Sequence, residues 1–522
     1  MNIIFFNGHI YGHPEAEAVL VVNDSIYHIG SLAECRNLAG ITVNEIDLHH
    51  KMLLPAFTDA HTHFVEYAKS RLLVNLLDCS SIEEIRSYLI NYRNNLNWNA
   101  KWILGGGWNR NILKDPMELN RDLLDDIFPD IPVALFSRDY HAKLFNTKAM
   151  EIGNVKEDIQ DPQGGKFERM PDGRLSGVVF ETATEIIDPY IISPPQEALV
   201  KSIKDTVNDI YKWGLIGFHS MEYEASKDLL LLAQEQGSRF RFCWHFQASE
   251  LDKMISGELS SYEGDEYFKV GGLKLFGDGS LGSRTAAMFD PYPNQPDNFG
   301  ILRYRDEDLY YQMEKAAKAG FACTIHAIGD RCVRQVIDCV LRLNENPEYT
   351  NLFQRIEHVQ SIRLNDIDDL KKSGLFVSLQ PVHIANDIPM IHESWPNIEH
   401  EAYAFKSILD AGIPYAFGSD VPIESMNPFY GIYSAIQRRY KVSASGEQLN
   451  PTEIITVKQA IDGYTIGAAE SSCSAQIRGK IEKGYLADLI VIEDYRGLPD
   501  EYWIEAQSLL TMIGGEIVYA TL

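Results

Sequence analysis

Four histidines and one aspartate in this 522-residue chain stand at the ends of short apolar runs that we expect to be strands. They are His61, His63, His326, His358 and Asp420. Imidazole nitrogen and carboxylate oxygen together suit Zn, Mn, Fe or Ni. A lone His-x-His is weak evidence, either later histidine could be a satisfied core residue, and the aspartate could be a helix cap. Their shared position at strand ends makes a metal site the leading interpretation.

Lys274 is the most unusual side chain of the central region. It lies in VGGLKLFG (270–277), an apolar run that indicates a buried strand. An unpaired ammonium group there is costly, so the lysine either pairs, loses its proton or is modified. A neutral lysine amine can add CO2 to form a carbamate, an anionic ligand able to bridge two metal ions. The alternative is a salt bridge to Asp278 or another acid.

Eight apolar runs are the expected strands, and amphipathic stretches between the later ones, such as 309–320 and 331–346, indicate helices. The runs lie at 52–61, 214–221, 240–246, 270–277, 321–329, 355–359, 375–381 and 413–420. Strand and helix in alternation imply parallel strands with right-handed crossovers. Eight such units predict a closed (β/α)8 TIM-like barrel, whose active site is built at the carboxyl ends of the strands.

The chain ends and one long gap complete the expected organisation. Residues 1–54 contain short alternating strands, and 475–522 contain two more, which predicts a small β-sandwich domain made from both ends. The barrel then occupies 55–474. About 150 residues separate its first two strands, far more than a crossover needs. We therefore expect an inserted, lid-like segment at about 70–200.

Composition limits the classes of function. The chain has 74 acidic and 47 basic residues and a net charge of -27, which argues against nucleic-acid binding and against an anionic membrane surface. No apolar stretch is long enough for a membrane span, and the N-terminus has no signal-peptide pattern. The seven cysteines form no CxxC pair, which favours reduced thiols in the cytoplasm. The oligomeric state is left open, with a homodimer as one option.

Several motifs resemble those of the amidohydrolase superfamily. They are PAFTDAHTHF, GGLKLFGDGSLGSRTAAM, HAIGDRCV, RIEHVQ and GSDVP. The order His-x-His, Lys, His, His, Asp along a barrel is the pattern of that superfamily. The lysine motif with GSRTA and the following HAIGDR are more similar to its YtcJ-like branch, amidohydrolase family 3. The similarity extends over most of the chain.

The resemblance implies a metal centre with one or two divalent ions, with zinc expected. His61 and His63 would hold the first ion together with Asp420. The second ion would be held by two histidines of later strands, His326 and His358. Carbamylated Lys274 would bridge the two.

It also implies a reaction. A bound metal ion lowers the pKa of water from about 16 to near 7, which provides hydroxide at neutral pH. Asp420 would act as general base and then as general acid toward the leaving nitrogen. The expected reaction is hydrolysis of a non-peptide carbon–nitrogen bond in a small amide, N-formyl or cyclic amide compound. The alternatives are a metal-dependent esterase or phosphotriesterase, a mononuclear enzyme with unmodified Lys274, and a non-catalytic regulatory relative.

Four further residues are candidates for substrate binding. Trp108 could form an apolar wall of the pocket, or pack inside the inserted segment. His141 stands where the branch often has Asp-Gly-His-Ser, but residues 139–142 read Asp-Tyr-His-Ala here. Arg284 could bind a substrate anion or brace its loop. His383, in LQPVH, matches a motif of the branch and is a candidate pocket residue.

Overall fold

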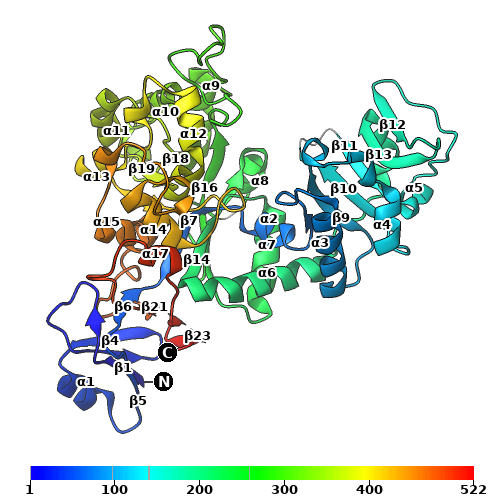
Figure 1. The fold of residues 1–522 in the computed structure, drawn as a ribbon. Helices are drawn as coiled ribbons and strands as arrows, with labels where there is room; N and C mark the ends of the chain where they lie inside the picture. The colour runs from blue at the N-terminus through cyan, green and yellow to red at the C-terminus, as the bar shows by residue number, and fades with distance from the viewer. Residues whose placement is uncertain (1, 97, 139–141, 258) are drawn as a thin grey trace. The chain divides into compact units, whose positions relative to one another are not determined.

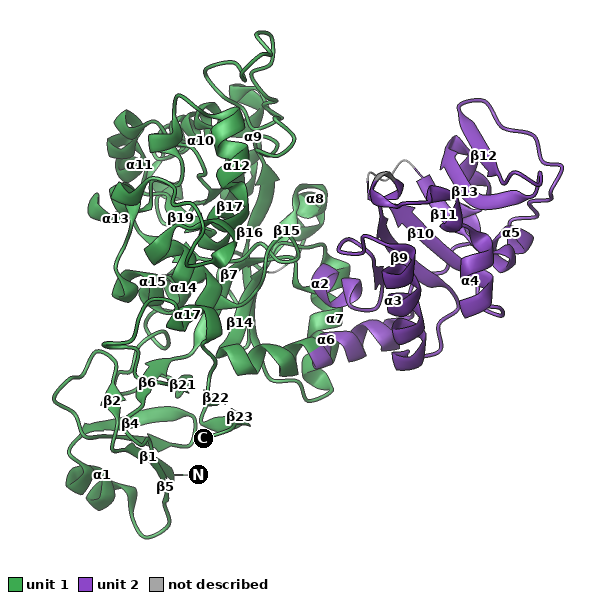
Figure 2. Ribbon diagram, viewed as in Figure 1, with its two compact units in different colours: residues 1–64, 206–522 green, residues 65–205 purple. Residues whose placement is uncertain are grey.

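The computed structural model describes residues 2–96, 98–138, 142–257 and 259–522. Two compact units are distinguished by their internal contacts (Figure 2). The first contains residues 1–64 and 206–522, and the second contains 65–205. Within the described residues, no helix has both the length and the apolar character that a membrane crossing requires. The seven cysteines are free thiols.

An eight-stranded parallel sheet forms the centre of the first unit (Figure 1). Its strands coincide with the eight predicted runs. They are β7 (Phe57–Thr62), β14 (Leu215–Ser220), β15 (Arg241–Gln247), β16 (Phe268–Phe276), β17 (Cys323–Ala327), β18 (Arg355–His358), β19 (Phe376–Leu379) and β20 (Tyr415–Phe417). The order around the sheet is β7, β14, β15, β16, β17, β18, β19, β20.

The first and last strands come together and almost close the sheet. The backbone N–H of Asp420 donates to the carbonyl of His61, and the N–H of His63 donates to the carbonyl of Val421, both at 2.8 Å. Gly418 allows this approach, since a Cβ there would lie 2.5 Å from the backbone nitrogen of His61. The predicted TIM-like barrel is therefore confirmed.

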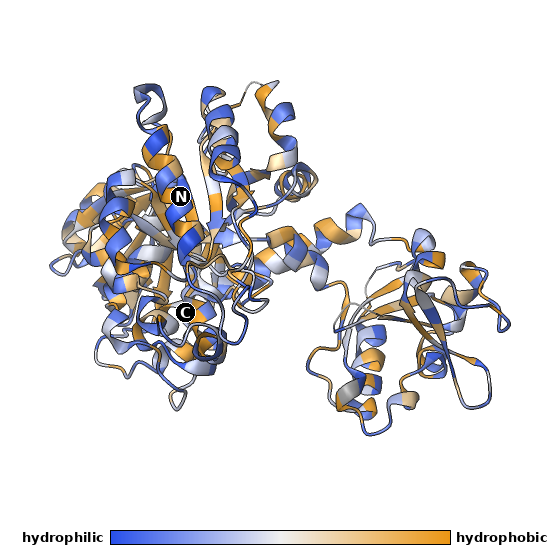
Figure 3. Ribbon diagram, turned by 90° about the horizontal axis from the view of Figure 1, so that it is seen from above, coloured by the Kyte–Doolittle hydropathy of each residue, from blue (hydrophilic) through white to orange (hydrophobic). Residues whose placement is uncertain are grey.

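Amphipathic helices alternate with the barrel strands along the chain, as α10 (Asp330–Leu343) illustrates. Its buried residues include Val333, Val336, Ile337 and Val340, which lie on one face at helical spacing. Figure 3 shows hydrophobic and hydrophilic residues alternating around such helices. The others in this unit that reach seven residues and lie wholly within it are α1 (Leu32–Ala39), α7 (Glu224–Glu235), α9 (Asp306–Lys318), α11 (Ile367–Ser373), α12 (Ile384–Ser394), α14 (Pro428–Gln437) and α15 (Val457–Tyr464).

Two smaller sheets are made from the chain ends. The four-stranded one is entirely N-terminal and contains β1 (Asn2–Phe6), β3 (Ala18–Val22), β4 (Ser25–Gly30) and β5 (Asn44–Asp47). The five-stranded one uses both ends and contains β2 (His9–Ile10), β6 (Met52–Pro55), β21 (Leu489–Ile492), β22 (Leu510–Ile513) and β23 (Glu516–Ala520). Their buried side chains form one shared apolar core, which includes Val19, Leu53 and Met512.

A buried ion pair joins these sheets to the barrel. Arg241, the first residue of β15, donates from Nε and Nη2 to the carboxylate of Asp488 at 2.8 and 2.9 Å. Asp488 also accepts the backbone N–H of Gly514 at 2.8 Å. Because both charged side chains are buried, the pair holds the start of a barrel strand against the sheet that carries β21.

The second unit, into which the predicted insertion at about 70–200 falls, has a sheet of its own. Its strand order is β12 (Gly165–Arg169), β13 (Leu175–Glu181), β11 (Ala142–Phe145), β10 (Val133–Ser137), β9 (Ile103–Trp108), β8 (Val74–Asn75). Helices α3 (Ile82–Asn95), α4 (Arg121–Ile127) and α5 (Thr147–Ile152) belong to the same unit. Gly106 in β9 has φ 150, and a Cβ there would lie 2.1 Å from the carbonyl oxygen of Phe136.

A candidate metal site at the carboxyl end of the barrel

The barrel places the predicted ligands at one end. His61 is the penultimate residue of β7, His326 is penultimate in β17, and His358 ends β18. Lys274 is the third residue from the end of β16, and Asp420 follows β20 by three residues. Because the strands are parallel, these positions all belong to the carboxyl end of the barrel.

The carboxylate of Asp420 is the meeting point of the site. Its Oδ1 lies 3.3 Å from Nε2 of His61 and 3.3 Å from Nε2 of His63. One potential ligand atom from each of His61, His358 and Asp420 can be chosen so that all lie within 4.8 Å of one another, and all three residues are buried. The rings of His61 and His358 are 4.9 Å apart between centroids.

His326 lies beside this group but has hydrogen-bond partners of its own. Its ring is 4.5 Å from that of His358 between centroids. Its Nε2 is 2.9 Å from the carbonyl oxygen of Gly279 and 3.5 Å from Oδ1 of Asp278. Burial and the nearby Lys274 lower the pKa of His326 to about 3, so its imidazole is neutral.

Lys274 is buried without a hydrogen-bond partner for its Nζ among the described residues. The salt bridge to Asp278 is not formed, because that carboxylate accepts backbone N–H groups from Ala287, Ile328 and Gly329 at 2.9 to 3.0 Å. Burial lowers the pKa of Lys274 from 10.5 to about 8, although Glu357 and Asp420 oppose the shift. A substantial share of the amine is therefore neutral near that pH.

Unusual backbone conformations help to converge the ligands. Asp420 has φ 61 and His358 has φ 78, values that are uncommon for residues other than glycine. In a regular strand Glu357 and His358 would face opposite sides. Here Glu357 accepts a hydrogen bond from the ring of His61, and the ring of His358 lies beside that same ring. The break in the strand at His358 thus lets two neighbouring side chains reach the same histidine.

The electrostatic surroundings favour the metal-binding forms of Asp420 and His358. Burial alone would raise the pKa of Asp420, but His61 and His63 hold that pKa well below its usual range, so the carboxylate is ionised. Burial, reinforced by His326, holds the pKa of His358 well below its usual range. Carboxylate and neutral imidazole are the forms that bind metal ions.

These residues fit a divalent metal ion. The Nε2 of His61 and the Nζ of Lys274 are buried polar atoms with no hydrogen-bond partner in the described chain. Zinc ligands at about 2.0–2.1 Å lie about 3.3 Å from one another in a tetrahedral site. The spacing of 3.3 Å between His61 Nε2 and Asp420 Oδ1 matches that value.

The four candidate substrate residues have different surroundings. His383 is buried after β19, with Nε2 3.9 Å from Oδ2 of Asp420 and 3.3 Å from the carbonyl oxygen of Ser419. Arg284, with φ 53 in the loop after β16, forms an ion pair with Glu393. Trp108 packs in the core of the second unit, where its Nε1 donates to the carbonyl of Leu135 at 2.8 Å. His141 lies outside the described residues.

Sequence reasoning missed three residues that hold the candidate ligands. Oε2 of Glu357 is 2.6 Å from Nδ1 of His61, and Oε1 of Gln380 is 2.8 Å from Nδ1 of His358. Arg355 in turn donates from Nε to Glu357 at 3.0 Å. The signal was present in RIEH, because two charged residues in a buried strand are as unusual as Lys274 in its own strand.

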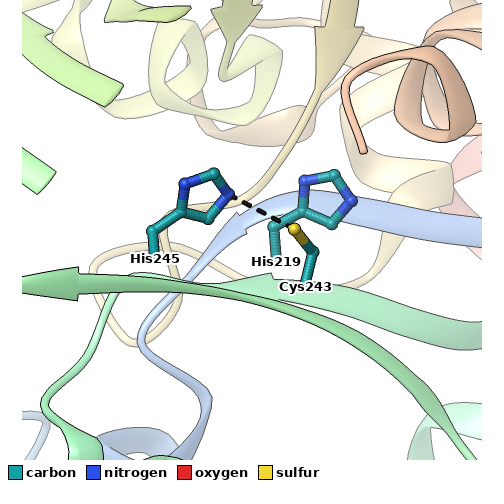
Figure 4. Close-up of side chains that lie close together, drawn as sticks. All are labelled: His219, Cys243 and His245. Atoms are coloured by element: carbon teal, nitrogen blue, oxygen red, sulfur yellow. Dashed lines mark hydrogen bonds between the residues drawn. The ribbon is translucent and has the colours of Figure 1, made fainter. Parts of the chain in front are cut away.

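A second group of potential ligands lies on β14 and β15. His219, Cys243 and His245 are buried, and one potential ligand atom from each can be chosen so that all lie within 4.8 Å of one another (Figure 4). The Sγ of Cys243 is 3.7 Å from Nε2 of His245. This group had no predicted role, although His219 and His245 lie near the ends of predicted strands, as the candidate ligands of the main site do.

Comparisons with known proteins agree with the geometry. A family model described as "Amidohydrolase family" matches residues 44–519. The YtcJ protein of Bacillus subtilis (strain 168), named as an amidohydrolase, is 29% identical over 99% of each chain. An N-substituted formamide deformylase of Arthrobacter pascens is 23% identical over 92% of this chain and 90% of its own. A solved structure of an uncharacterized metal-dependent hydrolase from Pyrococcus horikoshii OT3 has a TM-score of 0.77 at 25% identity, with 96% of this chain and 99% of that chain covered.

Proposed function

Since the chain belongs to the amidohydrolase family, we propose that this metal-dependent hydrolase cleaves a non-peptide carbon–nitrogen bond in a small molecule. One observation carries the proposal. The ligand atoms of His61, His358 and Asp420 converge in a buried group at the carboxyl end of the barrel. The unpartnered amine of Lys274 belongs to the same end of the barrel.

The proposed ligand set follows from these positions. His61, His63 and Asp420 would hold a first divalent ion, most suitably zinc. His326 and His358 would hold a second, because each presents a neutral imidazole. The lowered pKa of Lys274 supports carbamylation: the neutral amine attacks CO2, a proton leaves, and the resulting anion can bridge two cations.

A bound divalent ion would supply Lewis acidity and lower the pKa of a coordinated water molecule. Asp420 is proposed as the general base, since its ionised carboxylate lies at the centre of the imidazole group. Its oxygen would take the proton of the attacking water and return it to the leaving nitrogen. His61 and His63, whose Nε2 atoms each lie 3.3 Å from that carboxylate, would hold the same metal ion with it.

The substrate class is proposed as an amide, an N-formyl compound or a cyclic amide. The similarity to an N-substituted formamide deformylase supports the N-formyl group as the first choice. His383, 3.9 Å from Asp420, is the best supported substrate-binding residue. Arg284 is proposed to act on the same substrate, and Trp108 and His141 stay predictions.

The test is a substrate screen on protein reconstituted with zinc in bicarbonate. The panel contains N-formyl amines, N-acyl amines and cyclic amides, with carboxylic esters and phosphotriesters as the competing classes. We expect hydrolysis of a carbon–nitrogen substrate that a chelator abolishes and zinc restores. Hydrolysis that survives chelation would contradict the assigned site, and activity on esters or phosphotriesters alone would contradict the substrate class.

A further inference from the structure

We propose that Glu357 is the positioning residue of the metal site, which fixes the ring of His61 through a buried hydrogen-bonded chain that continues to Arg355 and His219. The inference rests on the proposed function, because it concerns how one metal ligand is held. It assigns a role to side chains that touch no substrate.

Glu357 determines which nitrogen of His61 carries hydrogen. Its Oε2 lies 2.6 Å from Nδ1 of His61, and a carboxylate can only accept, so Nδ1 must donate. The other ring nitrogen, Nε2, is the atom that faces Asp420 at 3.3 Å. Metal-binding histidines in proteins have this arrangement, in which the nitrogen remote from the metal donates to a carboxylate or carbonyl.

Arg355 fixes Glu357 and the strand of His61 together. Its Nε donates to Oε1 of Glu357 at 3.0 Å, and its Nη2 donates to the carbonyl oxygen of Ala60 at 2.9 Å. Ala60 immediately precedes His61 in β7. One guanidinium group therefore sets both the carboxylate that orients the ring and the backbone that carries it. Glu357 and Arg355 are completely buried, so water does not substitute for either partner.

His219 supplies the next acceptor of the chain. Arg355 Nη1 is 2.9 Å from Nδ1 of His219, and a guanidinium group can only donate. Nδ1 must therefore be the unprotonated nitrogen, and the hydrogen of the neutral ring sits on Nε2. Burial holds the pKa of His219 well below its usual range, in agreement with a neutral ring.

This assignment argues against a second metal site in the His219, Cys243 and His245 group, although Nε2 of His219 has no hydrogen-bond partner among the described residues. Nδ1 of His245 accepts the backbone N–H of Gly272 at 3.0 Å, which is shorter than the 3.4 Å between Arg355 Nη1 and Nε2 of His245, so Nδ1 is assigned as the unprotonated nitrogen. Both rings then carry hydrogen on Nε2, and the Nε2–H of His245 points toward the sulfur (Figure 4). A metal-binding histidine requires the opposite arrangement, with a donor on its remote nitrogen.

Replacing Glu357 with glutamine tests the proposal with little change of shape. Glutamine offers an oxygen to one neighbour but an NH2 group to the other, so it cannot accept from both His61 and Arg355. Zinc affinity is measured by competition with a chromophoric chelator, together with zinc content after dialysis. We expect E357Q to bind zinc about 10–100-fold more weakly than the wild type.

Glu453→Gln is the matched control. Glu453 is also a buried carboxylate, but it accepts from the backbone and hydroxyl of Ser407, which are not part of the site. E453Q should bind zinc like the wild type. Equal zinc affinity in E357Q and wild type would overturn the positioning role while leaving the proposed function intact. A wild type that binds no zinc would overturn both.

A measurement on the wild type covers the case in which E357Q does not fold. Ring nitrogen-15 NMR of the zinc-loaded protein, with His61 assigned by its loss in H61N, reports which nitrogen carries hydrogen. Hydrogen on Nδ1 of His61 supports the proposal, and hydrogen on Nε2 refutes it.

Discussion

Replacement of Lys274 with methionine should stabilise the metal-free protein and abolish its metal-dependent activity. The Nζ of Lys274 is buried with no hydrogen-bond partner among the described residues, so its charged form is held there at a cost. Methionine has a similar length and no charge. The same substitution removes the amine that we propose to become a carbamate. Stability and function should therefore change in opposite directions.

The magnitude follows from the pKa. Burial lowers the pKa of Lys274 from 10.5 to about 8. One pKa unit corresponds to about 1.4 kcal/mol, so charging the folded amine costs about 3 kcal/mol more than charging the unfolded one. Below pH 8 both states are protonated and the whole cost is present. Between pH 8 and 10.5 the folded amine has lost its proton while the unfolded one still holds it, so the cost disappears as the pH rises.

The assay is the urea midpoint of chelator-treated protein at pH 7 and at pH 10. K274M should unfold at higher urea than the wild type at pH 7, and the difference should narrow at pH 10. Lys269→Met is the control, because Lys269 lies in the same strand but donates to the carbonyl of Cys473 at 3.1 Å. Zinc with bicarbonate should raise the midpoint of the wild type more than that of K274M. A metal-free K274M less stable than the wild type at pH 7 would refute the reasoning.

Three further changes test other parts of the structure. Asp420→Asn should lower kcat by about 10²–10⁴-fold in steady-state assays of the zinc-loaded enzyme, because it removes the proposed general base. Asp488→Asn should destabilise the protein by about 3–5 kcal/mol in urea unfolding, because it leaves the buried guanidinium of Arg241 without its charge partner; an unchanged midpoint would contradict this. Cys243→Ser should leave the zinc stoichiometry unchanged in elemental analysis, and the loss of one zinc ion per chain would show that its group binds metal after all.

The barrel could be predicted from the sequence because its signals are local. Each of the eight strands is a short apolar run, and the helices between the later ones have helical spacing of apolar residues. The two sheets made from the chain ends were harder to predict from the sequence. β1 pairs in parallel with β5, so the N-terminal sheet is completed within the first 47 residues, and this pairing depends on a crossover through α1 that alternation does not reveal.

The proposed ligand residues could be selected by type and position, but the contacts between them could not be predicted. The approach of Asp420 to His61 depends on closure between the first and last strands and on a left-handed backbone at Asp420. The bond between Glu357 and His61 joins residues 296 positions apart. Such contacts arise from the register of the whole sheet. The sequence of one strand therefore does not show which side chain a histidine on that strand will contact.

The polar layer beneath the proposed ligands is the strongest physical reason to connect the barrel interior with catalysis. Barrels of this type are usually filled with layers of bulky apolar side chains. Here the interior contains a completely buried arginine and glutamate, Arg355 and Glu357, and burial holds the pKa values of His219 and His245 beside Arg355 well below the usual range. Well-packed apolar residues are often as stabilising as a buried ion pair or more so, so stability gives little reason for this pair. The geometry of the pair does give a reason. Glu357 fixes the ring hydrogen of His61 on Nδ1, and Arg355 fixes the backbone of the preceding residue, Ala60. A barrel whose only task was to fold would not need that arrangement, whereas a metal ligand held to one orientation does.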